Sequence, residues 1–106
     1  MSWTAYKKRM RKGAKLYIYN MRRPSRSRHV VIVSRSKRSC VVQDVKTHDL
    51  ASLEFPPAAF TRMIDGNDVE YLADANGPRF DERGNIIGEI LAGSPFMTIR
   101  IEGEAP

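Results

Sequence analysis

Residues 29–45, HVVIVSRSKRSCVVQDV, constrain the fold more than any other part of the chain. Two apolar runs, 30–33 and 40–42, flank a polar connector, 34–39, that holds three cations and no acid. β-Branched residues fill both runs, each run is too short for a helix, and the connector has the length of a turn. The pattern therefore predicts a β-hairpin. Because the first run has no polar alternate, we expect its strand to be central in its sheet and covered on both faces.

A further strand is predicted just before the hairpin, at 14–20. Apolar Leu16 and Ile18 alternate there with larger polar or amphipathic side chains. Alternation with a period of two places these two sets on opposite faces of a strand. The outward-facing side chains are then Lys15, Tyr17 and Tyr19. Because consecutive strands usually pair, we expect an antiparallel meander of three strands.

The N-terminal segment, 2–12, is predicted to be a short basic helix. Ser2 can cap it, Gly13 can end it, and an apolar stripe recurs at helical spacing. The stripe consists of Trp3, Tyr6 and Met10. A helix of about three turns is marginally stable alone, so the stripe must dock on another surface. We expect docking on the same chain, with a partner-facing arm as the alternative.

The second half of the chain predicts short elements with frequent turns. We expect a turn or edge strand at 50–55, a helix near 57–64 that places Phe60, Met63 and Ile64 in the core, a strand at 69–73, a turn at 75–78, a tight hairpin at 79–86, and strands at 86–91 and 96–101. The hairpin sequence, Phe80-Asp81-x-x-Gly84-Asn85, resembles the hairpin of tyrosine-aspartate repeats, and the resemblance implies a turn.

These elements predict a mainly β chain, with α+β as the alternative class. About six short strands and two short helices favour a small antiparallel barrel or a strongly curved sheet. In size and strand count the chain resembles SH3-like and OB-like barrels, which implies architecture alone. We expect a basic N-terminal helix or arm at 1–13 and one small β-rich domain at 14–106.

Charge is distributed very unevenly along the chain. Residues 1–43 carry 13 Lys and Arg and no acid, whereas residues 44–106 carry 5 Lys and Arg and all 12 acids. The two parts therefore have formal charges of +13 and −7, in agreement with the net charge of +6. Such asymmetry indicates a nucleic acid, an anionic surface or an acidic protein as the partner.

The basic half supplies the candidate binding residues. Arginine suits bidentate phosphate contacts, and outward tyrosines can stack on bases. The candidates are Lys7, Lys8, Arg9, Arg11, Lys12, Lys15, Tyr17, Tyr19, Arg22, Arg23, Arg26, Arg28, Arg35, Lys37 and Arg38. In a meander, the loops that hold Arg22–Arg28 and Arg35–Arg38 lie at opposite ends of the strands, roughly 20 Å apart. A nucleic-acid backbone that runs along the sheet could reach both loops.

We therefore expect a non-enzymatic protein that binds DNA or RNA largely without regard to sequence. The alternative is a small structural or interaction subunit, such as a virion component or an inhibitor, that binds an acidic protein surface. Either could act as a homo-oligomer or within a larger assembly. No apolar run reaches the ~20 residues that a membrane span needs, and no secretory signal is visible.

Little in the sequence indicates catalysis. His29 and His48 are the only histidines, and Cys40, the only cysteine, lies in an apolar run typical of a packed, unreactive thiol. Zinc-ligand spacing, a phosphate-binding glycine loop and a nucleophile elbow are all missing. We expect neither a metal nor a cofactor. A single thiol suits a reducing compartment, so the expected location is the cytoplasm, or a virion for a viral protein.

Overall fold

The computed structural model describes residues 1–74 and 77–106 and is mainly β. Its elements are α1 (Trp3–Arg9), β1 (Lys15–Asn20), the 3-10 turn η1 (Pro24–Arg26), β2 (Arg28–Arg35), β3 (Ser39–Asp44), β4 (Leu50–Glu54), the 3-10 turn η2 (Ala58–Phe60), β5 (Thr61–Met63), β6 (Asp68–Leu72), β7 (Gly77–Phe80), β8 (Ile86–Ile90) and β9 (Pro95–Gly103). Neither the helix nor the 3-10 turns are long and apolar enough to span a membrane.

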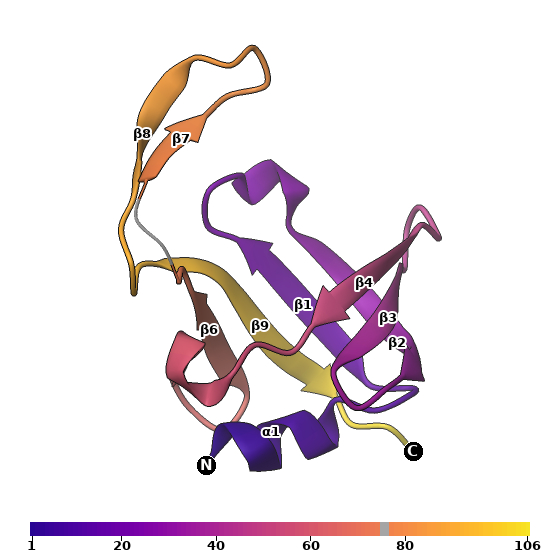
Figure 1. The fold of residues 1–106 in the computed structure, drawn as a ribbon. Helices are drawn as coiled ribbons and strands as arrows, with labels where there is room; N and C mark the ends of the chain where they lie inside the picture. The colour runs from indigo at the N-terminus through magenta and orange to yellow at the C-terminus, as the bar shows by residue number, and fades with distance from the viewer. Residues whose placement is uncertain (75–76) are drawn as a thin grey trace.

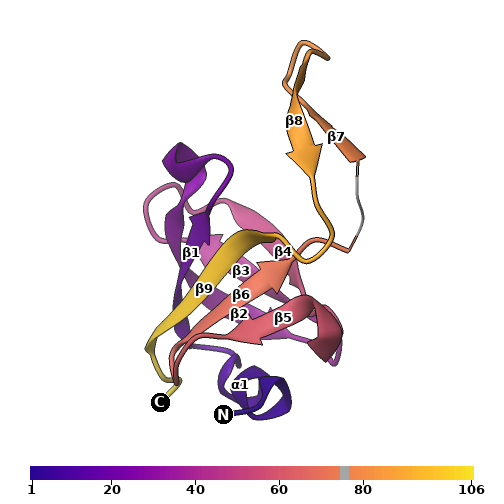
Figure 2. The same cartoon turned by 90° about the vertical axis from the view of Figure 1, so that its left-hand side faces the viewer.

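Seven strands form one antiparallel sheet in the order β4-β3-β2-β1-β9-β6-β5. The sheet curls strongly, but its edge strands β4 and β5 do not pair with each other. The prediction of a small antiparallel barrel or strongly curved sheet is therefore confirmed as an open curved sheet. β7 and β8 form a separate two-stranded sheet that stands off from the body (Figures 1 and 2). We call residues 77–91 the arm.

The predicted meander is confirmed, with β1 paired to β2 and β2 paired to β3. Val30 and Ile32 of β2 point into the core. Cover on both faces was expected for β2 and is wrong, because Val31 and Val33 are only half-buried on the outer face. The pairing register accounts for one of the two, Val33.

A β-bulge interrupts the pairing of β2 with β3. Ile32 lies opposite Val42 and Ser34 lies opposite Val41, so Val33 is an extra residue. A bulge breaks the strict alternation of faces. Beyond it, Arg35 lies opposite the buried Cys40 and points to the inner side of the sheet.

Helix α1 closes one end of the curled sheet (Figures 1 and 2). The Ser2 hydroxyl caps it by accepting a hydrogen bond from the Ala5 N–H at 3.1 Å. All three residues of the predicted stripe are buried. Trp3 Nε1 donates to the Pro56 carbonyl at 2.8 Å, and the Tyr6 hydroxyl donates to the Asn67 carbonyl at 2.7 Å. The helix therefore docks on its own chain, as expected. The alternative, an N-terminal segment that faces a partner, is wrong.

The helix expected near 57–64 is wrong. Only the single turn η2 forms, and Thr61–Met63 then pairs with β6 as strand β5. Sheet pairing overrides the local helical pattern there, so Phe60 and Met63 are half-buried and Ile64 is 52% exposed. The segment at 50–55 contains the edge strand β4. Residues 75 and 76 of the turn expected at 75–78 lie outside the described residues.

The tight hairpin expected at 79–86 is confirmed as the tip of the arm. The Asp81 N–H donates to the Asn85 carbonyl at 2.9 Å, and the Gly84 N–H donates to the Asp81 carbonyl at 3.1 Å. Gly84 has φ +85°, a conformation that glycine adopts without strain. The strands expected at 69–73, 86–91 and 96–101 correspond to β6, β8 and β9.

Candidate nucleic-acid interface

The outer face of β1 carries a row of amphipathic side chains, Lys15, Tyr17 and Tyr19, which we call the tyrosine ridge. They point outward because Leu16 and Ile18 are buried in the core between them. The two tyrosine ring centroids are 6.4 Å apart, and Tyr19 is 38% exposed. The outward direction of these side chains is as predicted, and the ridge presents two neighbouring aromatic rings, with Tyr17 half-buried and Tyr19 exposed.

Paired polar groups border the ridge on both sides. On β2, His29 lies beside the Tyr17 ring at 4.6 Å, and its Nδ1 is hydrogen-bonded to Glu102 at 2.6 Å. On β9, Arg100 donates to Asp68 at 2.8 Å, and this hydrogen bond together with the charge of Asp68 raises the pKa of Arg100. His29 and Arg100, on either side of the ridge, are therefore each paired with an acid. The ridge itself contains no acidic residue.

The structure gathers cations from two distant segments at the end of the sheet closed by α1. Arg35 lies at the junction, where its Nε donates to the Met10 carbonyl at 2.8 Å. This contact brings the β2–β3 turn against the C-terminal end of the helix. Both segments carry exposed cations at this end of the sheet, and we call them the cationic end: Lys8, Arg11, Lys12, Lys37 and Arg38. No ion pair within the described residues involves any of the five.

Two of the candidate binding residues at this end have intramolecular partners instead. Arg9 is paired with Glu104 at 2.6 Å and also donates to Asn67 Oδ1 at 2.9 Å and to the Gly66 carbonyl. The Arg35 guanidinium lies 4.3 Å from the centroid of the Phe55 ring and donates to helix carbonyls. Positive charge at a helix C-terminus is favourable, so these contacts hold α1 in place.

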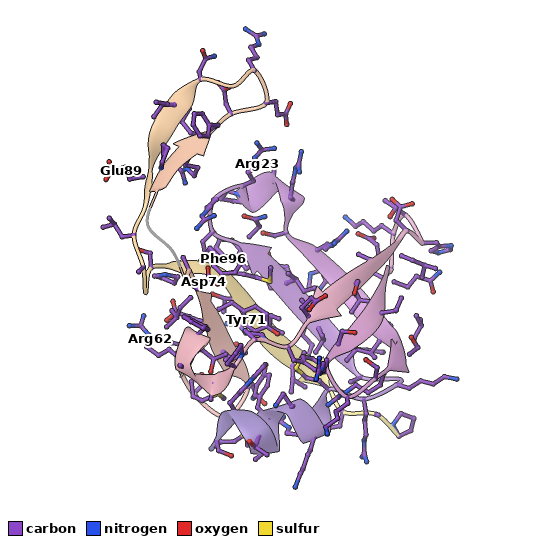
Figure 3. The ribbon with its side chains drawn as sticks, in the orientation of Figure 1. Arg23, Arg62, Tyr71, Asp74, Glu89 and Phe96 are labelled. Carbon is purple, nitrogen blue, oxygen red and sulfur yellow. The ribbon has the colours of Figure 1, made fainter. Side chains whose placement is uncertain are left out.

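The arginine loop, Arg22–Arg28, lies at the opposite end of β1, as the meander predicted. Asn20 shapes the loop, because its Oδ1 accepts hydrogen bonds from the Arg22 and Arg23 N–H groups at 3.0 and 2.9 Å. Glu82 at the tip of the arm accepts from Arg23 at 2.8 Å and from Arg26 at 3.3 Å. Figure 3 shows Arg23 on the side of the loop that faces the arm.

The remaining arginines of this loop lie near an aromatic ring and an acid. The Arg22 guanidinium lies 5.2 Å from the centroid of the Phe96 ring. Arg28 and Asp44 line the same hollow at the open mouth of the sheet. Hydrogen bonds from the Thr47 and Lys46 N–H groups hold the pKa of Asp44 below its usual value, with a smaller contribution from Arg28. The loop that looked free of acids in the sequence is therefore close to Glu82 and Asp44 in space.

The only cysteine of the chain lies in β3. Cys40 is buried against the core, and burial raises the pKa of its thiol to about 11, partly offset by Arg35. This keeps the thiol protonated at neutral pH and far from the state of a reactive nucleophile. Residues 1–74 and 77–106 contain no group of three or more His, Cys, Asp or Glu side chains arranged to hold a metal ion.

A groove that the sequence did not predict opens along the seam between β4 and the β6–β9 side of the sheet. It has a volume of about 480 Å³ and is lined chiefly by apolar side chains, among them Leu53, Phe55, Tyr71, Phe96 and Met97. The Tyr71 hydroxyl bridges the seam by donating to the Glu54 carbonyl at 3.2 Å. The groove exists because the sheet remains open, and periodicity alone cannot distinguish an open sheet from a closed one.

The chain matches no known protein-family model, no curated protein and no solved structure. Its chemistry must therefore be inferred from the cationic end, the tyrosine ridge, the arginine loop and the groove.

Proposed function

We propose that this chain is a non-enzymatic nucleic-acid-binding protein with little sequence preference. The observation that carries the proposal is the cationic end, where two segments of the chain place five exposed cations at one end of the sheet, none with an ion pair in the described residues. Like charges at one end of the sheet repel one another, and a polyanion relieves the repulsion while releasing its own counterions.

The tyrosine ridge extends this surface along the sheet. Lys15 lies at the start of β1, next to the cationic end, and Tyr19 lies near the arginine loop. Six strand residues cover roughly 20 Å, which allows a nucleic-acid backbone to pass from one end to the other. Bases of any kind can stack on aromatic rings, so the ridge favours single-stranded nucleic acid without selecting a sequence.

Phosphate contacts supply affinity and little sequence information, because every nucleotide carries the same phosphate. The residues that we assign to phosphates are Lys8, Arg11, Lys12, Lys15, Lys37 and Arg38, with the four arginines of the arginine loop as a second, partly neutralised set. Arg9 and Arg35 position the helix in this proposal. A reducing compartment such as the cytoplasm suits the single buried thiol of Cys40.

The test is the salt dependence of binding to duplex DNA. Log affinity should fall linearly with log salt, by about 0.9 for each phosphate neutralised. Replacing the five residues of the cationic end with Gln should reduce that slope by about four units, equally for unrelated sequences. The matched control replaces Lys46 and Arg83, exposed cations elsewhere on the chain, with Gln and should change the slope by less than about one unit.

Replacing the four arginines of the arginine loop with Gln should reduce the slope by only one to two units, roughly, because Glu82 and Asp44 already neutralise part of their charge. If the cationic-end variant binds with the wild-type slope while its thermal unfolding is unchanged, the proposal is wrong. An acidic protein surface would then be the leading partner, and the same variant should lose that partner.

A further inference from the structure

The arm presents an apolar face that its own chain leaves uncovered. Phe80 and Ile86 lie opposite each other in the β7–β8 pairing and therefore share one face, with exposures of 51% and 68%. Pro78 and Glu89 are also cross-strand partners and are both exposed. Figure 3 shows Glu89 on the side of the arm turned away from the body.

A lone two-stranded hairpin is marginally stable in water, and this one packs chiefly against itself among the described residues. Among the described residues, the ion pairs of the arm with the body are those of Glu82, at the tip, with Arg23 and Arg26. The exposed apolar side chains of the arm stabilise a structure only when another surface covers them. The arm therefore has the properties of a docking element.

The seam groove offers a surface of matching chemistry. Phe96 and Met97 line its wall, and Arg22 stacks over Phe96. Within the described residues Arg22 has no ion pair, and neither has Glu89 on the arm. The groove thus combines an apolar wall with an unpaired cation, and the arm combines an apolar face with an unpaired acid.

We propose that two copies of this chain exchange arms, each placing the face formed by Phe80 and Ile86 in the seam groove of the other. Glu89 of each arm then pairs with Arg22 over the Phe96 ring of the partner copy. The contact is reciprocal and closes on itself, so the product is a dimer with twofold symmetry and not an open chain.

The area of the exposed apolar side chains supports a second copy as the occupant. Phe80 and Ile86, which form the docking face, are 51% and 68% exposed. At about 200 Å² for a large apolar side chain they expose roughly 240 Å² per arm. Two arms and an equal area of two grooves would then bury about 1,000 Å² in total, the lower limit for a specific interface.

The first test is sedimentation equilibrium on the full chain, freed of nucleic acid, at about 0.15 M salt. The wild-type protein should be dimeric at about 10 μM, and Ile86→Ser should raise the dimer dissociation constant at least about 10-fold. Ile64→Ser, at an exposed isoleucine outside both surfaces, is the matched control and should leave the constant unchanged. A wild-type protein that stays monomeric at about 500 μM would overturn the proposal.

The second test does not depend on the arm remaining folded in a variant. Glu89→Arg and Arg22→Glu should each weaken the dimer about 10-fold, and the double variant should return to within about threefold of the wild type. If the double variant is as weak as the single variants, this pairing is wrong.

Mixing separates arm exchange from a dimer in which two arms pack against each other. Ile86→Ser and Arg22→Glu chains combined in equal amounts can form one intact contact, the Arg22→Glu arm in the Ile86→Ser groove. Native mass spectrometry should show a heterodimer in preference to either homodimer. If the heterodimer is no more abundant than the homodimers, the proposed exchange of arms is wrong. Nucleic-acid binding at the cationic end lies at other residues, so failure here leaves the proposed function in place.

Discussion

The two ends of β1 are both rich in cations, yet they differ in what surrounds the charges. At the cationic end, five exposed Lys and Arg side chains have no ion pair in the part of the chain that the structure describes. At the arginine loop, Arg23 and Arg26 share Glu82, Arg28 lies near Asp44, and Arg22 stacks on Phe96. The two segments are similarly rich in cations in the sequence, but in the described part of the structure only the arginine loop has acids paired with its cations.

The difference arises because compensation comes from segments distant in the sequence. Glu82 is more than fifty residues from Arg26, and only the projection of the arm brings them together. Near the cationic end, Glu54 of β4 lies opposite Ser39, the residue after Arg38. The Glu54 carboxylate forms no ion pair among the described residues. A run of arginines is therefore a weaker sign of a binding surface than cations that two separate elements bring together.

The largest effect is expected from the tyrosine ridge, which connects the two ends. Replacing Tyr17 and Tyr19 together with Ala should weaken single-stranded binding by about 2–5 kcal/mol, because stacking contributes ~1–3 kcal/mol per base. Duplex binding should change much less, because paired bases cannot stack on the ridge. Fluorescence anisotropy with single-stranded and duplex probes of one sequence measures both. Equal losses on the two probes would show that the rings support the fold alone.

Arg35 and Arg38 provide a comparison within the cationic end. Arg35→Ala should lower the free energy of unfolding by about 2–3 kcal/mol, because it removes charged hydrogen bonds to the Lys7 and Met10 carbonyls and the contact with Phe55. Arg38→Ala should stay within about 0.5 kcal/mol of the wild type, because Arg38 is exposed. Urea unfolding measures both. Similar values for the two variants would contradict the structural role assigned to Arg35.

The smallest effect is expected when the arginine loop is made to resemble the cationic end. Glu82→Gln removes the carboxylate that Arg23 and Arg26 share. The salt slope for duplex DNA should become steeper by about one to two units, and affinity at low salt should rise a few-fold. Asp81→Asn alters an acid that instead accepts hydrogen bonds within the tip, so it serves as a control for changes in the arm. A slope that does not change for Glu82→Gln would show that the loop does not contact phosphate.

Much of the fold follows from alternation and turn chemistry. The buried stripe of Trp3, Tyr6 and Met10, the outward tyrosines of β1 and the turn at Gly84 could be predicted because each depends on neighbours close in the sequence. The predictions fail where pairing with a segment distant in the sequence decides the secondary structure. Thr61–Met63 becomes a strand because β6 is available to pair with it, and a helical pattern cannot reveal that.

The candidate site likewise has a part that could be predicted from the sequence and a part that could not. Sequence reasoning identified the basic segments, because charge composition is local. It could not assign Arg9 and Arg35 to structural contacts, because Glu104 and the helix carbonyls are reached only through the fold. The seam groove was missed for a further reason, since closure of a sheet depends on the curvature summed over seven strands and leaves no mark in any one segment.

The bulge in β2 has a consequence for how the chain tolerates changes in length. Under strict alternation from Ile32, Ser34 would enter the core and Arg35 would face solvent, leaving the end of α1 and the Phe55 ring without their partner. The extra residue, Val33, shifts the alternation by one position, so Ser34 faces outward and Arg35 faces inward. Deleting it would restore a regular strand and keep Arg35 on the inner side, whereas inserting one residue after Ser34 would turn Arg35 outward. Between these two changes of equal size, the shorter chain should be the one that still folds.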